Sequence, residues 1–346
     1  MKNVLVIKLR YIGDVLLATP TVRAIKAARP DVRVTIMVNR GTEDVLSGSQ
    51  DLDEIMVLDK GSLLAQGQFI ARLRRRGFDT VIDLTDGDRS AFLSWVSGAP
   101  VRIGFNDEHR WRGRCYTEVV QPTTGMRHRI DRDLEVLKPL GIQACSREPQ
   151  LCLTSEEEKD ADHLLDQLGV QRSQPMVILQ PGARYWFKAW PSERFAELAD
   201  HLMSPYGCQV LIGGSDQDID LAQQIQQMAK SKPIIMAGRT TIKQFAAIAK
   251  KSALFVGSDS GAMHITSAVG TPVVALFGPS SPHEWGPRGG PVEVLYKEID
   301  CRSCFHPTCT KGEGNCMRLI AVHEVFAAAQ RLLHARSRAA GSKAED

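Results

Sequence analysis

Along the first 84 residues of the chain, segments with the apolar pattern of a strand alternate with segments with the apolar pattern of a helix. A β-branched and leucine-rich run at residues 3–9 predicts a strand, helical spacing at residues 21–30 predicts a helix, and residues 32–38 return to strand character. Further strands are expected at residues 53–59 and 79–84, around a helix at residues 62–77. This order is typical of a parallel, doubly wound α/β sheet.

The second half of the chain repeats this alternation. After a polar helix at residues 155–169, strands are expected at 176–182, 209–214, 233–238, 253–261 and 271–279, and helices at 192–204, 218–229, 241–252, from about 262, and at 321–337. The pattern predicts two Rossmann-like domains, residues 1–165 and 166–335, with the boundary near residues 160–175 and a disordered tail at 336–346. Two such domains facing each other would place their ligand sites on opposite walls of a cleft.

Charge and hydropathy narrow the class of protein. A net charge of +3 is too mild to indicate a nucleic-acid partner. No apolar run approaches the roughly 18 residues that span a bilayer, and Lys8 interrupts the N-terminal apolar stretch, so a cytoplasmic protein is expected. Arginines gather between residues 102 and 132, which indicates either an anionic partner or a solvated basic surface.

The turn after the first strand carries a carboxylate where a phosphate-binding loop is common. Residues 7–20 read IKLRYIGDVLLATP and lack G-x-G-x-x-G, which argues against a nicotinamide dehydrogenase. Asp14 repels phosphate, so two interpretations stay open. It is either the N-cap of the next helix or a general base that accepts a proton from an acceptor hydroxyl.

The corresponding turn of the second half has the opposite character. Ser258, Asp259, Ser260 and Gly261 join a strand to a helix, where free backbone N–H groups can bind a diphosphate, and His264 follows on the first turn. A cap for Asp259 and a packed side chain for His264 are the alternatives. In the loop after residues 176–180, Lys188 could neutralise a phosphate as a point charge.

The cysteines fall into two groups. Four of the eight are scattered and are expected to be free thiols in a reducing compartment. The others form a C-x2-C-x4-C-x6-C cluster of Cys301, Cys304, Cys309 and Cys316. Its first spacing suits zinc, but the later spacings do not match a standard zinc finger, so we expect no metal and keep a metal site as the alternative.

Five segments together resemble a known family. IKLRYIGDVLLATP, DLTDGDRSAFLSWVSG, QPGARYWFKAWP, SDSGAMHITSAVGTPVVALFGPSSPHEWGP and CRSCFHPTCTKGEGNCM resemble, in order and spacing, the lipopolysaccharide heptosyltransferases of glycosyltransferase family 9, particularly the heptosyltransferase III type. The resemblance implies a GT-B fold and metal-independent, inverting transfer without a cofactor. The expected donor is ADP-heptose, held by the C-terminal domain, and the acceptor is the lipid A-anchored inner core at the inner membrane.

The resemblance also assigns roles to individual residues. Asp14 is similar to the general base and Lys188 to the donor phosphate ligand, while Ser260, Gly261 and His264 are similar to part of the diphosphate site. The acidic residue that meets the donor ribose would be Asp216 or Asp218. A phosphorylated acceptor implies a basic N-terminal wall, for which Arg89 and Arg129 are candidates.

Two other functions stay open at this stage. Nucleotide-sugar 2-epimerases use similar paired domains but need no acceptor. A non-enzymatic nucleotide-sugar sensor or metal-binding protein would instead make use of the clustered cysteines.

Overall fold

The computed structural model describes residues 1–59, 61–123, 125–299, 301, 304 and 309–342. The chain divides into two compact units, Met1–Cys152 and Leu153–Asp346. The boundary therefore lies before the polar helix α6 (Ser155–Gln167), whereas the sequence suggested residue 165, which is inside that helix. The reason is that α6 is tied to the end of α9 (Ile242–Lys251), where Lys250 Nζ lies 2.7 Å from Glu158.

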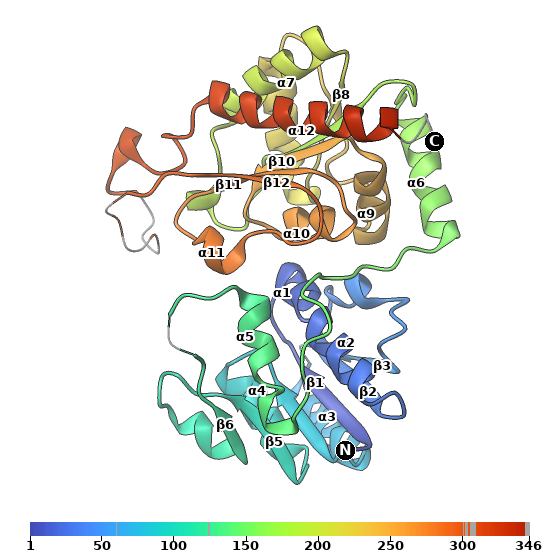
Figure 1. Cartoon of the computed structure of the whole chain (residues 1–346), viewed down its shortest axis with the longest axis vertical. Helices are drawn as coiled ribbons and strands as arrows, with labels where there is room; N and C mark the ends of the chain where they lie inside the picture. Colours follow the sequence, from blue (N-terminus) through green and yellow to red (C-terminus); the bar gives the residue numbers. More distant parts are fainter. Residues whose placement is uncertain (60, 124, 300, 302–303, 305–308, 343–346) are drawn as a thin grey trace. The chain divides into compact units, whose positions relative to one another are not determined.

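The first unit is built on a six-stranded parallel sheet in the order β3-β2-β1-β4-β5-β6 (Figure 1). Its strands are β1 (Asn3–Ile7), β2 (Arg33–Asn39), β3 (Glu54–Leu58), β4 (Thr80–Asp83), β5 (Val101–Phe105) and β6 (Glu118–Val120). Strand β4 is buried along its whole length, as is β1 from its second residue, because layers on both faces cover the centre of a parallel sheet. The strand order reverses between β1 and β4, and ligands bind at such a point beyond the carboxyl ends of the strands.

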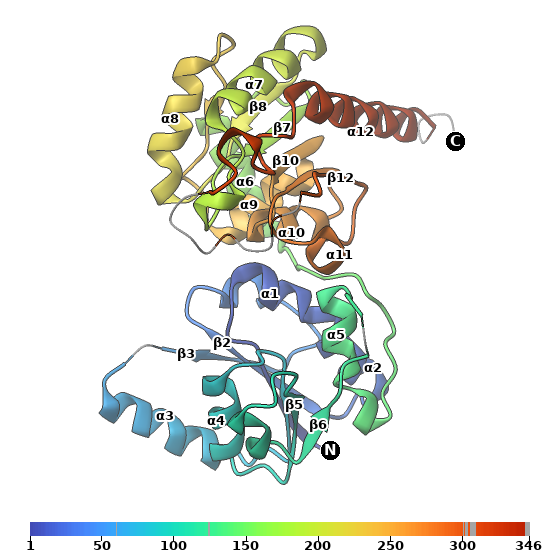
Figure 2. The ribbon, with the colours of Figure 1, turned by 90° about the vertical axis from the view of Figure 1, so that its left-hand side faces the viewer.

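Among its described residues, the first unit has five α-helices. They are α1 (Ile12–Leu17), α2 (Thr19–Ala28), α3 (Leu63–Arg75), α4 (Asp88–Val96) and α5 (Arg129–Glu135), with short 3₁₀ turns at Glu43–Leu46, Trp111–Cys115 and Lys138–Leu140. Helix α2 buries an apolar face that includes Val22 and Ile25. Helix α3 is mostly exposed and lies beside α4 (Figure 2).

The second unit repeats the same connectivity in a six-stranded parallel sheet of order β12-β11-β10-β7-β8-β9. Its strands are β7 (Met176–Gln180), β8 (Gln209–Ile212), β9 (Ile234–Ile235), β10 (Leu254–Ser258), β11 (Val273–Phe277) and β12 (Val292–Tyr296). Here the order reverses between β7 and β10, both of which are buried along their whole length. The prediction of two doubly wound α/β domains is confirmed.

The helices of the second unit surround its sheet and extend almost to the C-terminus. Besides α6 and α9 they are α7 (Ser192–Tyr206), α8 (Ile219–Met228), α10 (Gly261–Ala268), α11 (Pro282–Trp285) and α12 (Val322–Ser342), with 3₁₀ turns at Trp186–Lys188, Asp216–Asp218 and Gly312–Gly314. The expected tail at residues 336–346 is therefore helical up to Ser342, and residues 343–346 lie outside the described part. None of the helices in the described ranges combines the length and the apolar character needed to cross a bilayer.

Candidate active site

Asp14 lies in the first turn of α1, just beyond the carboxyl end of β1, where the strand order of the first sheet reverses. The N-cap of α1 is Tyr11, so the interpretation of Asp14 as the cap is wrong. Tyr11 has a φ of 28°, a backbone conformation that residues with a β-carbon rarely adopt and that is enriched at functional sites. The turn thus places Asp14 beyond the carboxyl end of the central strand β1, and Asp14 is not the helix cap.

Two cations interact with Asp14. Lys8 is only 1% exposed, and its Nζ lies 2.6 Å from Asp133 Oδ2 and 3.1 Å from the carbonyl oxygen of Leu84. Arg129 Nε lies 3.1 Å from the other carboxylate oxygen of Asp133. Burial raises the pKa of Asp14, and the charges of Lys8 and Arg129 oppose that rise. A carboxylate whose pKa is raised toward the working pH is a suitable general base.

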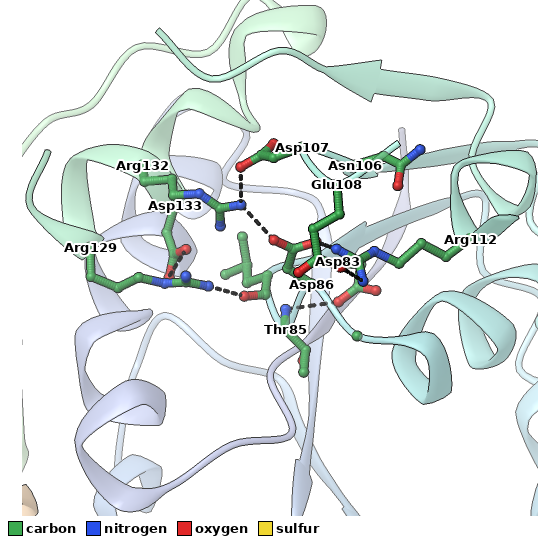
Figure 3. A network of polar contacts seen from close by, with 12 residues as sticks. Asp83, Thr85, Asp86, Asn106, Asp107, Glu108, Arg112, Arg129, Arg132 and Asp133 are labelled. Carbon is green, nitrogen blue, oxygen red and sulfur yellow. Dashed lines mark hydrogen bonds and ion pairs between the residues drawn. The ribbon is translucent and has the colours of Figure 1, made fainter. Parts of the chain in front are cut away.

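A second group of charges follows β4 in the same unit (Figure 3). The carboxylate of Asp86 accepts hydrogen bonds from Arg112 at 2.8 Å and from Arg132 at 2.6 Å. Arg132 also bonds to Asp107 at 3.0 Å, and its guanidinium lies 4.0 Å from the ring centroid of Phe105. This network fixes the loops around the end of β4.

Most arginines between residues 102 and 132 are paired within the first unit, whereas the sequence had left open an anionic partner or a solvated basic surface. Carbonyl or carboxylate oxygens hold Arg102, Arg110, Arg112, Arg127, Arg129 and Arg132. Most of their charge is therefore used within the unit.

The two arginines proposed to bind the acceptor differ in their surroundings. Arg89 is exposed at the start of α4 and borders a pocket of about 400 Å³. Arg129 is 13% exposed and donates a hydrogen bond of 2.7 Å to the carbonyl oxygen of Leu84, in addition to its contact with Asp133. Arg129 thus belongs to the group of charged residues around Asp14, whereas Arg89 remains available to a ligand.

In the second unit, the switch between β7 and β10 brings Lys188 and Asp259 together. Lys188 Nζ lies 2.6 Å from Asp259 Oδ2, and Ser280 Oγ donates a hydrogen bond of 2.7 Å to the same oxygen. His264 Nε2 lies 3.9 Å from the other oxygen of Asp259. Asp259 therefore holds the Lys188 ammonium beside the turn that was predicted to bind the donor.

The turn between β10 and α10 offers donors for an anion. Ser260 is the N-cap of α10 but makes no side-chain capping bond. Within the described ranges, the buried hydroxyls of Ser258 and Ser260 have no hydrogen-bond partner. Gly261 begins the helix, whose first backbone N–H groups point outward unpaired in any α-helix. Donors without partners at a helix start, next to Lys188, suit a phosphate group.

The two acidic candidates for the donor ribose differ in availability. Asp218 accepts hydrogen bonds of 2.8 Å from both the backbone N–H and the hydroxyl of Ser215. Asp216 is exposed at the start of the short turn after β8. Asp216 is therefore the freer of the two carboxylates.

The clustered cysteines do not have metal-site geometry among the described residues, where no group of three or more His, Cys, Asp or Glu side chains could hold a metal ion. Cys316 is buried, and Cys301, Cys304 and Cys309 are half-buried. Burial, together with the neighbouring thiols, raises the pKa of Cys304 to about 11. Residues 302–303 and 305–308, which lie between these cysteines, are outside the described part.

Sequence reasoning missed three residues of these two sites, namely Lys8, Asp133 and Ser280. A lysine at the end of an apolar strand was a usable signal for Lys8, because such a position is buried and needs a counterion. Asp133 and Ser280 lie far along the chain from their partners, and no local pattern marks them.

Comparison with known proteins identifies relatives over most of the chain. Residues 67–314 match the family model described as glycosyltransferase family 9 (heptosyltransferase). The chain is similar to lipopolysaccharide heptosyltransferase 3 of Escherichia coli (strain K12), with 32% identity over 295 residues that cover 81% of this chain and 83% of the relative.

Two solved structures share the fold. The glycosyl transferase family 9 structure from Veillonella parvula DSM 2008 superimposes with a TM-score of 0.84 at 25% identity, covering 96% of this chain and 97% of that one. E. coli ADP-heptose lps heptosyltransferase II gives a TM-score of 0.80 at 24% identity, covering 97% and 100%. The likeness extends over both units.

Proposed function

Because this chain belongs to glycosyltransferase family 9, the heptosyltransferases, we propose that it moves heptose from ADP-L-glycero-D-manno-heptose to the inner core of lipopolysaccharide. The chain is a glycosyltransferase with two Rossmann-like units of the GT-B type. The choice of donor sugar and acceptor is our inference from the names of its relatives.

One observation carries this proposal. Both sheets place functional groups at the point where the strand order reverses, and the two sets of groups are complementary. The first unit offers the carboxylate of Asp14, and the second offers Lys188 with the start of α10. Transfer with inversion needs a base on the acceptor oxygen and a positive site on the departing diphosphate, and these groups supply both.

We assign roles on the donor side as follows. Lys188 and the N–H groups at Ser260 and Gly261 bind the diphosphate and stabilise the charge that ADP gains as the glycosidic bond breaks. Asp259 holds Lys188 in position, His264 belongs to the diphosphate site, and Asp216 meets the ribose. Since Lys188 supplies the positive charge, the proposed reaction needs no metal or other cofactor.

On the acceptor side, Asp14 takes the proton from the attacking hydroxyl, and Arg89 binds an acceptor phosphate. The acceptor in this proposal is anchored in the inner membrane by lipid A, so the enzyme works at the cytoplasmic face of that membrane as a peripheral protein. No nucleic acid takes part.

The proposal is tested by transfer of labelled heptose from ADP-heptose to truncated core acceptors, followed by linkage analysis. Labelled product must appear with the wild type and must be nearly absent with Asp14→Asn. Incubation with ADP-heptose alone is the control, because a 2-epimerase would convert the donor without an acceptor. Elemental analysis of the purified protein tests the metal-binding alternative, which would show a stoichiometric metal and no transfer.

A further inference from the structure

The pocket beside Arg89 has an apolar floor and a cationic rim. It encloses about 400 Å³ between the end of β3, one face of α3 and one face of α4. Leu58, Phe69 and Leu93 are buried beneath it, at 6%, 9% and 5% exposure. Arg72 and Arg89 stand at its rim. This volume is in the usual range for small-molecule pockets, and the combination of walls suits an amphiphile with an anionic head.

The helices around the pocket expose apolar side chains to solvent. On α4, Phe92 is 40% exposed and Trp95 is 55% exposed, and their ring centroids are 6.1 Å apart. Leu64, in the first turn of α3, is 73% exposed. Neighbouring exposed apolar side chains on a folded protein mark an interaction surface more often than isolated ones do.

The same surface is basic. The last turn of α3 carries exposed Arg72, Arg74 and Arg75. Asp59 also lines the pocket, but its charge is paired with that of Arg40, and Asp88 lies 2.9 Å from Arg110. The surface therefore keeps an excess of positive charge.

Tryptophan and arginine around an apolar pocket match the interface of an anionic bilayer. Aromatic rings favour the headgroup level, arginine pairs with phosphate, and an apolar cavity beneath them can accept a chain. Trp, Phe and Arg are also enriched at protein interfaces, so the test below includes self-association as an outcome that would contradict the proposal.

We propose that α3 and α4 form a docking surface for an anionic phospholipid bilayer. In this arrangement the pocket takes an acyl chain, Arg72 pairs with a headgroup phosphate, and Phe92 and Trp95 enter the interface. The inference deepens the proposed function, on which it rests for its biological purpose, because an enzyme with a lipid-anchored acceptor gains from being held at the membrane.

Sedimentation of the full-length protein with vesicles tests the docking surface. We expect binding to phosphatidylcholine vesicles that contain phosphatidylglycerol, weakening with added salt, and little binding to phosphatidylcholine alone. Arg72→Gln should lower the partition coefficient about fivefold, the effect of one basic residue near such a surface. Trp95→Ser should lower it about tenfold through the lost apolar burial.

Matched controls are Arg29→Gln, an exposed arginine at the end of α2, and Tyr296→Ser, an exposed aromatic residue of the second unit. Neither control should change vesicle binding. Thermal melting of each variant confirms that it is folded. The proposal is wrong if the protein binds both kinds of vesicle equally, binds neither, or loses binding equally in the control variants. It is also wrong if the protein self-associates without any effect of lipid and Trp95→Ser abolishes that self-association.

Transfer to a delipidated, soluble acceptor separates this inference from the proposed function. Trp95→Ser and Arg72→Gln should transfer heptose to that acceptor at the wild-type rate. If the wild type binds anionic vesicles but fails to transfer, the proposed function is wrong and the docking surface stands. If the wild type transfers but does not bind vesicles, the docking surface is wrong.

Discussion

Replacing Lys188 with alanine removes the one cation that contacts Asp259 at hydrogen-bonding distance among the described residues. The pair is nearly neutral in the wild type, with Lys188 Nζ 2.6 Å from Asp259 Oδ2 and side-chain exposures of 22% and 9%. In Lys188→Ala, the Asp259 carboxylate keeps the hydrogen bond from Ser280 and lies 3.9 Å from His264, and we expect its charge to repel a bound diphosphate. The substitution therefore both removes an attraction and exposes a repulsion.

The size of this effect follows from Coulomb's law. One unit charge about 5 Å from another, at an effective dielectric constant of about 20, contributes about 3 kcal/mol. Loss of that amount corresponds to roughly a hundredfold weaker binding. We expect Lys188→Ala to weaken ADP by at least this factor, and the double variant Lys188→Ala/Asp259→Asn to recover about tenfold or more.

Isothermal titration with ADP measures both variants, and Lys230→Ala, an exposed lysine of the same unit, is the matched control. Thermal melts establish that each variant is folded. If the double variant binds ADP no better than Lys188→Ala, the repulsion by Asp259 has no role. If Lys188→Ala binds and turns over like the wild type, Lys188 does not belong to the site.

The remaining predictions test the first unit. Asp14→Asn should lower turnover by about two to four orders of magnitude without lowering the melting temperature. Burial raises the pKa of Asp14, so the charged carboxylate is unfavourable for folding above that pKa. The kcat of the wild type should fall as the pH drops through the same pKa, because the base becomes protonated. A kcat that stays constant at acidic pH would contradict the assignment of Asp14 as the base. Arg89→Glu should raise the acceptor KM and leave ADP affinity unchanged. Arg129→Glu should instead lower kcat, and steady-state kinetics distinguishes the two effects. Tyr116→Phe should lower the free energy of unfolding by about 1–3 kcal/mol in denaturant titrations, because buried Asp83 loses a hydrogen bond of 2.8 Å.

The regular α/β alternation could be predicted because both faces of each sheet are covered, so central strands such as β1 and β10 are continuous apolar runs. Strand β5 and the edge strands β6 and β12 were not anticipated. Each is short or half-exposed, as in the alternately half-buried Val292–Tyr296, and lacks the apolar run. Helix α5, of seven residues, is too short and too polar to show a helical period.

The candidate site could be predicted where a strand runs into a turn, as at Asp14 and at Ser258–Gly261. Its charge pairs could not. Lys188 meets Asp259 across 71 residues of sequence, and Arg132 meets Asp86 across 46. These partners follow from which loops share a sheet edge, so the sequence alone did not show that the arginines are paired.

The burial of Lys8 has a consequence for how the protein is made. The ribosome produces Lys8 125 residues before Asp133, the carboxylate that neutralises it. A lysine without a counterion resists burial at a cost of several kcal/mol, so β1, although synthesised first, cannot settle into the middle of its sheet until α5 has emerged. Stalled nascent chains in which α5 has not yet emerged from the ribosome should therefore stay sensitive to protease, and those in which residues 1–152 have emerged should resist it. The first strand to be translated would then be among the last to take its native position in the sheet.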